Sequence, residues 1–102
     1  MAALALTGCD RLAGRTAGER IWRAECAHCH GLDGAGNTPR FMGNVWADLT
    51  DDRWKEFGGD RSGLEMSIRA GTAADMPAFD QLTAEEMRTL LDHIARLRGE
   101  AR

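Results

Sequence analysis

Two cysteines and a histidine stand within five consecutive residues, Cys26-Ala27-His28-Cys29-His30. On a helical turn, cysteines three positions apart point to the same side, so both thiols can add to the two vinyl groups of one haem. The histidine that follows can then bring its imidazole to the iron. The C-x-x-C-H spacing is typical of covalent haem attachment, and it predicts one haem held by Cys26, Cys29 and His30.

Paired cysteines also occur in zinc sites and in redox dithiols. A structural zinc site needs four ligands, but the sequence has no second cysteine pair and His93 lies far along the chain. A thioredoxin-like dithiol is expected beside a βαβ pattern, and no segment of the sequence is rich in strand-forming residues. The sequence therefore favours haem over both alternatives.

The length and the charge of the chain limit what else it can be. With 102 residues it has room for one domain, whose core is small enough to need reinforcement, and a covalently bound macrocycle would supply it. Thirteen Lys and Arg stand against sixteen Asp and Glu, and no basic run is present that would neutralise a row of phosphates. We therefore expect no nucleic-acid partner.

A haem iron bound by His30 needs a second axial ligand. The sequence offers six candidates: Met42, Met66, Met76, Met87, His28 and His93. We expect Met66 and Met87 to be core residues of helices, because apolar residues recur around them at helical spacing. We expect His28 to be solvated and His93 to have a packing role.

Met76 is the candidate that the local sequence favours. It lies in a loop, 73–77, where Pro77 lacks an amide hydrogen and keeps the backbone before it extended. Such a loop can present a thioether rigidly. Its separation from His30 gives the chain enough length to reach the opposite face of a haem, whereas Met42 follows His30 too closely.

The chain resembles the small class I cytochromes c from about Gly18 to Leu97. The shared motifs are Gly18-x-x-Ile21-Trp22, the C-x-x-C-H segment, His30-Gly31-x-x-Gly34-x-Gly36, Ile68-Arg69-x-Gly71 and Met76-Pro77-x-Phe79 before a terminal helix. The resemblance implies an all-α cytochrome c fold, with three to five short helices wrapped around one covalently attached haem. It also implies that the N- and C-terminal helices cross.

The resemblance assigns further residues to the haem site. It makes Met76 the distal ligand opposite His30, and it makes the carbonyl of Pro39 the acceptor for the Nδ1 hydrogen of His30. Phe41 would pack against the haem. Two more apolar residues would line the distal side, Ile68 and Phe79.

Other residues are candidates for contacts at the edge of the haem. Trp46 or Trp54 could donate an indole hydrogen to a propionate, with Arg40 as a further partner. In the family an aromatic residue of the last helix is often set against a glycine of the first, and here His93 occupies that aromatic position opposite Gly18.

The periodicity predicts four helices. The first spans about 18–27, the second begins near Thr50 and ends at 58–59, and the third spans about 61–70. The last follows a capping box formed by Thr83 and Glu86. Its apolar face consists of Met87, Leu90, Leu91, Ile94 and Leu97.

The N-terminus predicts export and lipid attachment. The run Leu6-Thr7-Gly8-Cys9 resembles the bacterial lipobox, in which cleavage precedes a lipidated cysteine. Only eight residues precede Cys9 and none is charged, so we expect 1–8 to be the end of a longer signal. Residues 9–17 would then form the lipidated cysteine and a short tether, 18–99 the haem domain and 100–102 a tail. Asp10 resembles an inner-membrane retention signal.

These expectations combine into a function. With His and Met both bound, the iron would have no open position, so the sequence predicts a single-electron carrier and not an enzyme. It would work in the periplasm or at the membrane surface, between redox proteins such as a cytochrome complex, a dehydrogenase, an oxidase or a reductase. The alternatives are a sensor of carbon monoxide or nitric oxide and a haem subunit of a larger oxidoreductase.

The lipid anchor can be tested by fractionation. A Cys9→Ser variant should move from the membrane fraction to the soluble fraction, because it lacks the thiol that receives the acyl chains. If the variant stayed in the membrane fraction, lipid anchoring through Cys9 would be wrong.

Overall fold

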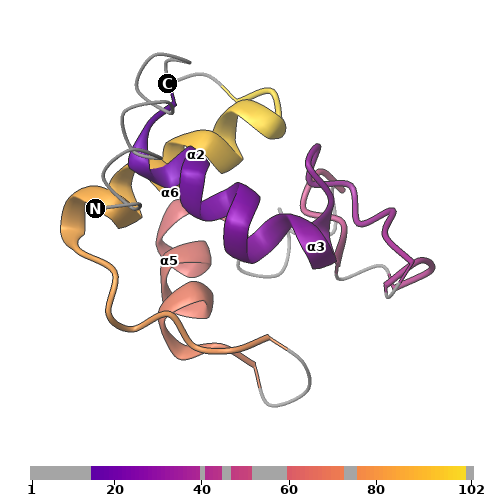
Figure 1. The fold of residues 1–102 in the computed structure, drawn as a ribbon, viewed down its shortest axis with the longest axis horizontal. Coiled ribbons are helices and arrows are strands. Elements are labelled where there is room, and N and C mark those ends of the chain that lie inside the picture. The colour runs from indigo at the N-terminus through magenta and orange to yellow at the C-terminus, as the bar shows by residue number, and fades with distance from the viewer. Residues whose placement is uncertain (1–14, 40, 45–46, 52–59, 73–75, 101–102) are drawn as a thin grey trace, which may run out of the picture.

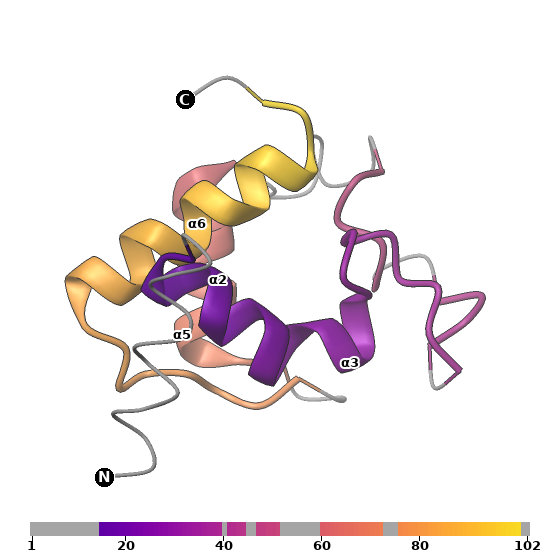
Figure 2. The ribbon, with the colours of Figure 1, turned by 45° about the horizontal axis from the view of Figure 1, so that its top comes forward.

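The computed structural model describes residues 15–39, 41–44, 47–51, 60–72 and 76–100. These residues form helices joined by loops, without a β-strand among them, and they confirm the predicted all-α class. The first helical stretch and the last helix cross, and a further helix, α5, packs against the last (Figures 1 and 2). None of the helices described combines the length and the apolarity that crossing a membrane requires.

The first helical stretch consists of three contiguous segments: α2 (Ala17–Ile21), η1 (Trp22–Cys26) and α3 (Ala27–His30). It begins after Thr16, whose hydroxyl accepts a hydrogen bond from the amide of Glu19 at 3.1 Å. A side chain of this kind satisfies one of the amides that the first turn leaves unpaired.

The middle segment of this stretch is wider than an α-helix. The Ala27 amide donates to the Trp22 carbonyl, five residues earlier, which makes η1 a π-helix. The stretch then continues for one more turn and ends at Gly31, whose φ of 82° suits glycine. The helix is therefore one turn longer at its C-terminal end than the predicted 18–27, and it carries both cysteines and His30.

Helix α5 (Arg61–Ala70) has the predicted bounds. The carboxylate of Asp60 accepts a hydrogen bond from Gly63 N at 3.2 Å at its start. Gly71 ends it, with a φ of 70°. The predicted helix before it, from Thr50 to 58–59, lies almost wholly outside the described residues, and Thr50 itself is part of a turn.

Helix α6 (Ala84–Leu97) begins with the predicted capping box. Thr83 N donates to a carboxylate oxygen of Glu86 at 2.8 Å, and Glu86 N donates to the Thr83 hydroxyl at 3.0 Å. Four members of its predicted apolar face are buried, and Leu97 is partly buried against the core. The buried members are Met87, Leu90, Leu91 and Ile94.

The crossing of α2 and α6 depends on Gly18. Its amide donates to the Thr89 hydroxyl at 2.8 Å, and a Cβ added at Gly18 would lie 2.0 Å from the Leu90 nitrogen. Only a glycine lets the two backbones approach so closely. The expectation that His93 faces Gly18 is wrong, because the helices cross at Thr89 and Leu90 and leave His93 against the indole of Trp22.

Trp22 lies at the centre of the core with an exposed fraction of 1%. It packs among side chains of the last two helices, including Leu64, Leu90 and Ile94. Met66 is not part of this cluster: its side chain is 70% exposed, so its predicted core role is wrong. Leu64 and Ile68 are four residues apart and occupy the inner face of α5, and Met66 lies between them on the outer face.

Candidate functional site

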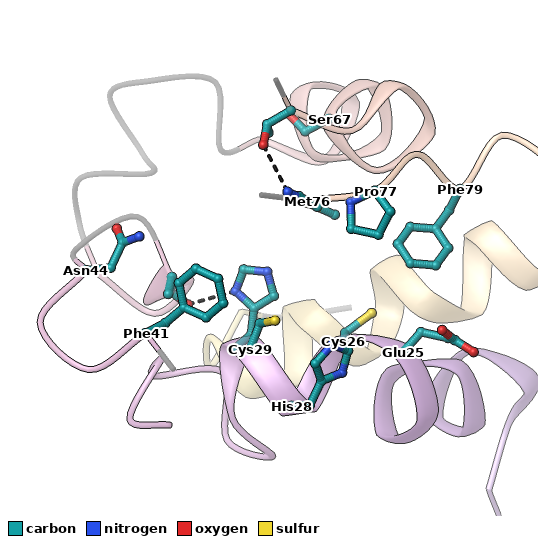
Figure 3. Close-up of a pocket in the computed structure, with 13 residues that line it drawn as sticks. Glu25, Cys26, His28, Cys29, Phe41, Asn44, Ser67, Met76, Pro77 and Phe79 are labelled. Atoms are coloured by element: carbon teal, nitrogen blue, oxygen red, sulfur yellow. Dashed lines mark hydrogen bonds between the residues drawn. The ribbon is translucent and has the colours of Figure 1, made fainter. Parts of the chain in front are cut away.

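The C-x-x-C-H segment opens onto a cavity of about 450 Å³. This volume lies within the range of about 300–1,000 Å³ that is usual for ligand pockets. One wall comes from the end of the first helical stretch, and the facing wall comes from α5 and the segment that follows it (Figure 3). The lining residues that these walls supply are Glu25, Cys26, His28, Cys29 and His30 on one side and Ser67, Thr72, Met76, Pro77 and Phe79 on the other.

Cys26 and Cys29 are both free thiols that line the cavity. They lie three positions apart on the same helical stretch, and Figure 3 shows both on the same wall. Burial raises the pKa of the Cys26 thiol to about 12, and electrostatic interactions with Glu25 and Cys29 add to the shift. The Cys26 thiol is therefore protonated at neutral pH.

His30 lines the same cavity, and its ring is held on two sides. Its Nδ1 lies 2.8 Å from the carbonyl oxygen of Ala47, so Nδ1 carries the hydrogen and Nε2 keeps its lone pair. The indole of Trp22 stacks on the ring with a centroid distance of 5.9 Å and an interplanar angle of 27°. Burial lowers the pKa of His30, which favours the neutral ring, the form that can ligate a metal.

The prediction that Pro39 accepts the Nδ1 hydrogen of His30 is wrong. The chain turns back toward the helix further along than expected, so the acceptor is the carbonyl of Ala47, and Pro39 is exposed. Sequence reasoning missed Ala47 because it contributes only a backbone oxygen, which no side-chain pattern marks.

Backbone hydrogen bonds hold this returning loop against the helix. Gly36 N donates to the carbonyl of His30 at 2.7 Å, and Leu49 N donates to the carbonyl of Gly34 at 2.8 Å. A Cβ added at Gly36 would lie 2.9 Å from the carbonyl carbon of Ala47 and 3.0 Å from its oxygen. Gly36, with a φ of 78°, therefore lets the Ala47 peptide pack closely beside the histidine.

Met76 and Pro77 lie on the wall that faces the cysteines (Figure 3). Thr72 N donates to the carbonyl of Met76 at 2.9 Å, and Met76 N donates to the Thr72 hydroxyl at 3.2 Å. The backbone of Gly71, with a φ of 70°, packs directly against Met76 and Pro77. These contacts fix the position of Met76 although residues 73–75 lie outside the described part of the chain.

The remaining predicted site residues have different outcomes. Phe41 and Phe79 line the cavity. Ile68 is not among the lining residues; it is buried in the core, and its carbonyl accepts a hydrogen bond from Phe79 N at 2.9 Å. Three candidates for contacts with propionates lie outside the described residues, namely Arg40, Trp46 and Trp54.

The donor set fits a covalently attached haem. The cavity has two thiols on one wall, an imidazole with a free Nε2, and a methionine on the facing wall. Apolar side chains of Phe41, Pro77 and Phe79 complete its lining. Within the described ranges, no group of three or more His, Cys, Asp or Glu side chains is arranged to hold a bare metal ion.

Comparison with known proteins gives matches at the level of family and of sequence. Residues 13–94 match the family described as cytochrome c oxidase, cbb3-type, subunit III. The chain is 34% identical over 83 residues to the cbb3-type cytochrome c oxidase subunit FixP of Azorhizobium caulinodans, covering 80% of this chain and 27% of that protein. No solved structure matches significantly.

Two further relatives carry the name cbb3-type cytochrome c oxidase subunit CcoP. The protein of Rubrivivax gelatinosus is 29% identical over 84 residues, which cover 80% of this chain and 25% of the relative. The protein of Rhodobacter capsulatus is 30% identical over 92 residues, which cover 82% of this chain and 29% of the relative. The chain thus spans about a quarter of the length of the curated relatives it matches.

A Gly36→Ala variant tests the role of the close approach to Ala47. The added methyl group should push the Ala47 carbonyl away and weaken its hydrogen bond with His30, which makes the imidazole less electron-rich. The reduction potential of the haem-loaded protein should rise, and the free energy of unfolding should fall by about 1–3 kcal/mol. The first is measured by potentiometry and the second by denaturant unfolding.

Gly43→Ala is the matched control. Gly43 also has a positive φ, of 88°, but none of the described residues lies within 4 Å of an added Cβ. The Gly43→Ala variant should lose stability because of its strained backbone, but its reduction potential should not change. Equal potential shifts in the two variants would contradict a specific role for the Gly36 contact.

Proposed function

Because this chain belongs to the family of cytochrome c oxidase, cbb3-type, subunit III, a family of c-type cytochromes that bind haem c, we propose that it transfers single electrons with one haem c. The observation that carries the proposal is the single cavity wall on which Cys26, Cys29 and His30 come together. Cys26 and Cys29 would hold the haem through thioethers, and His30 would be the proximal ligand.

The protein's own part in this chemistry is to fix the ligands and exclude water. The bound haem supplies the one-electron change between ferric and ferrous iron. The Ala47 carbonyl and the Trp22 indole hold His30 in one orientation, which lowers the structural change that accompanies each electron. Burial keeps the imidazole neutral, so Nε2 remains available to the iron.

Met76 is the best candidate for the distal ligand. Of the methionines that the structure describes, Met42 and Met66 are 72% and 70% exposed, and Met87 is buried in the core at 2%. Met76 lies across the cavity from the cysteines, as a ligand on the opposite face must. His28 lines the cavity but belongs to the same helical turn as the cysteines, so it is on the wrong wall.

The relatives' names support an oxidase of the cbb3 type as the redox partner. We propose that this chain delivers electrons to such a membrane-bound oxidase, either as one of its haem subunits or as a separate carrier. Both arrangements place the haem domain at the outer surface of the cytoplasmic membrane. A lipid on Cys9 would hold the domain there and raise its effective concentration near the oxidase.

Axial ligation by Met76 can be tested by substitution. In the wild type, the reduced protein should bind carbon monoxide slowly, because both axial positions are filled. Met76→Ala should open one position, bind carbon monoxide rapidly and lower the reduction potential, since a thioether ligand raises it. The measurements are absorption spectra of the oxidised, reduced and carbon monoxide-treated proteins.

Met42→Ala is the control, because its side chain is exposed and outside the cavity lining. It should leave the spectra unchanged. Rapid binding of carbon monoxide by the wild type would contradict a closed His/Met site and would favour the ligand sensor.

The partner is tested with a purified cbb3-type oxidase. The reduced haem protein should be oxidised by the oxidase, and oxygen should be consumed in proportion. A Cys26→Ala/Cys29→Ala double variant, which lacks the attachment sites, should not support oxygen consumption. Oxidation of the wild type at the same rate with and without the oxidase would overturn the assignment of the partner.

A further inference from the structure

The indole of Trp22 contacts two histidines. One is His30, stacked at a centroid distance of 5.9 Å, and the other is His93 of α6, at 5.8 Å with an interplanar angle of 57°. Trp22 is itself immobilised: it is 1% exposed, and its Nε1 donates to the carbonyl of Leu32 at 3.2 Å. A row of three rings therefore leads from the proximal wall of the cavity to the surface of α6.

His93 is the partly exposed end of this row, and charged groups surround it. The Arg96 guanidinium, one turn along α6, lies 3.1 Å from its Nδ1 and can donate to it only while that nitrogen is unprotonated. Glu19 and Arg23 face it from the first helical stretch, and these two side chains pair with each other at 3.4 Å. Glu19 favours a charged ring, and the two arginines oppose it.

Resting on the function proposed above, we propose that His93 is a positioning residue for the proximal ligand: acting through Trp22, its protonation raises the reduction potential of the bound haem. The structural basis is the continuous contact from His93 to Trp22 and from Trp22 to His30.

Protonation changes both the contacts and the charge at the end of the row. A protonated Nδ1 cannot accept from Arg96, and the two cations repel, so the ring must shift on the indole. An imidazolium is also attracted to the indole face. Because Trp22 is packed in the core, its displacement is transmitted to the stacked His30 ring.

The sign of the effect follows from the charge. Ferric iron carries one more positive charge than ferrous iron, so a new cation nearby disfavours the ferric state and raises the potential. Burial and the two arginines lower the pKa of His93 below its ordinary 6.5, in spite of Glu19. The ring is therefore neutral at neutral pH, and the rise in potential should occur in mildly acidic solution.

The test is a potentiometric titration of the haem-loaded protein from about pH 8 to about pH 4.5, a range that spans histidine protonation. The wild-type potential should rise as His93 is protonated. His93→Phe keeps an aromatic ring against Trp22 but cannot titrate, so this step should disappear. His93→Gln is a second neutral variant, included in case the phenyl ring of His93→Phe does not fit against Trp22. It should also lack the step.

Two further variants separate His93 from other groups. Arg96→Gln removes the cation beside Nδ1, so the step should remain and move to higher pH. His28→Gln removes the histidine at the cavity and should leave the His93 step in place. In the ferrous wild type, nuclear magnetic resonance should show the His93 ring and the Trp22 indole N–H titrating with the same midpoint.

The result that would overturn this proposal is an unchanged pH dependence of the potential in both His93→Phe and His93→Gln. A Trp22 indole signal that does not respond to His93 would also overturn it. Failure of the proposed function looks different, because the wild type would then carry no covalently bound haem and would have no potential to titrate.

Discussion

The hydrogen bond between His30 Nδ1 and the Ala47 carbonyl is the contact on which the site depends. It joins the end of the first helical stretch to a loop that returns from 17 residues further along the chain. It sets which ring nitrogen carries the hydrogen, and so which one would be free to bind a haem iron. The close packing of Gly36 against the Ala47 peptide leaves that carbonyl little freedom to move.

The rest of the fold holds two walls of the cavity at a fixed separation. One wall carries the two cysteines and His30, and the facing wall carries Met76. Gly18 brings the first stretch into backbone contact with α6, and α6 in turn packs against α5. Gly71 ends α5 and packs against the backbone around Met76. Close backbone approaches thus require glycine at Gly18, Gly36 and Gly71, and a covalently attached haem would fill the cavity that these backbones leave open.

Side-chain patterns predicted the bounds of α5 and the start of α6, because the physical basis of these boundaries is local. The capping box at Thr83 and the glycine after α5 act within one or two turns, and the structure has both of these helix boundaries as predicted. The end of the first stretch was less predictable, because a π-helical turn shifts the helix without a side-chain signal.

What the sequence did not predict depends on the path of the chain in space. Ala47 replaced Pro39 as acceptor because a backbone oxygen can belong to any residue that the loop happens to bring near. His93 contacts the ring of Trp22 because Thr89 and Leu90 set the register at which α2 and α6 cross. The role of Met76 as distal ligand and the role of Trp54 stay predictions, the latter outside the described residues.

The central claim, covalent attachment at Cys26 and Cys29, is tested most directly by mass spectrometry of wild-type protein matured in an export-competent host and extracted with acidified acetone. We expect the haem to stay on the polypeptide and to map to the peptide that contains both cysteines. Loss of all colour to the solvent, with both thiols unmodified, would contradict it.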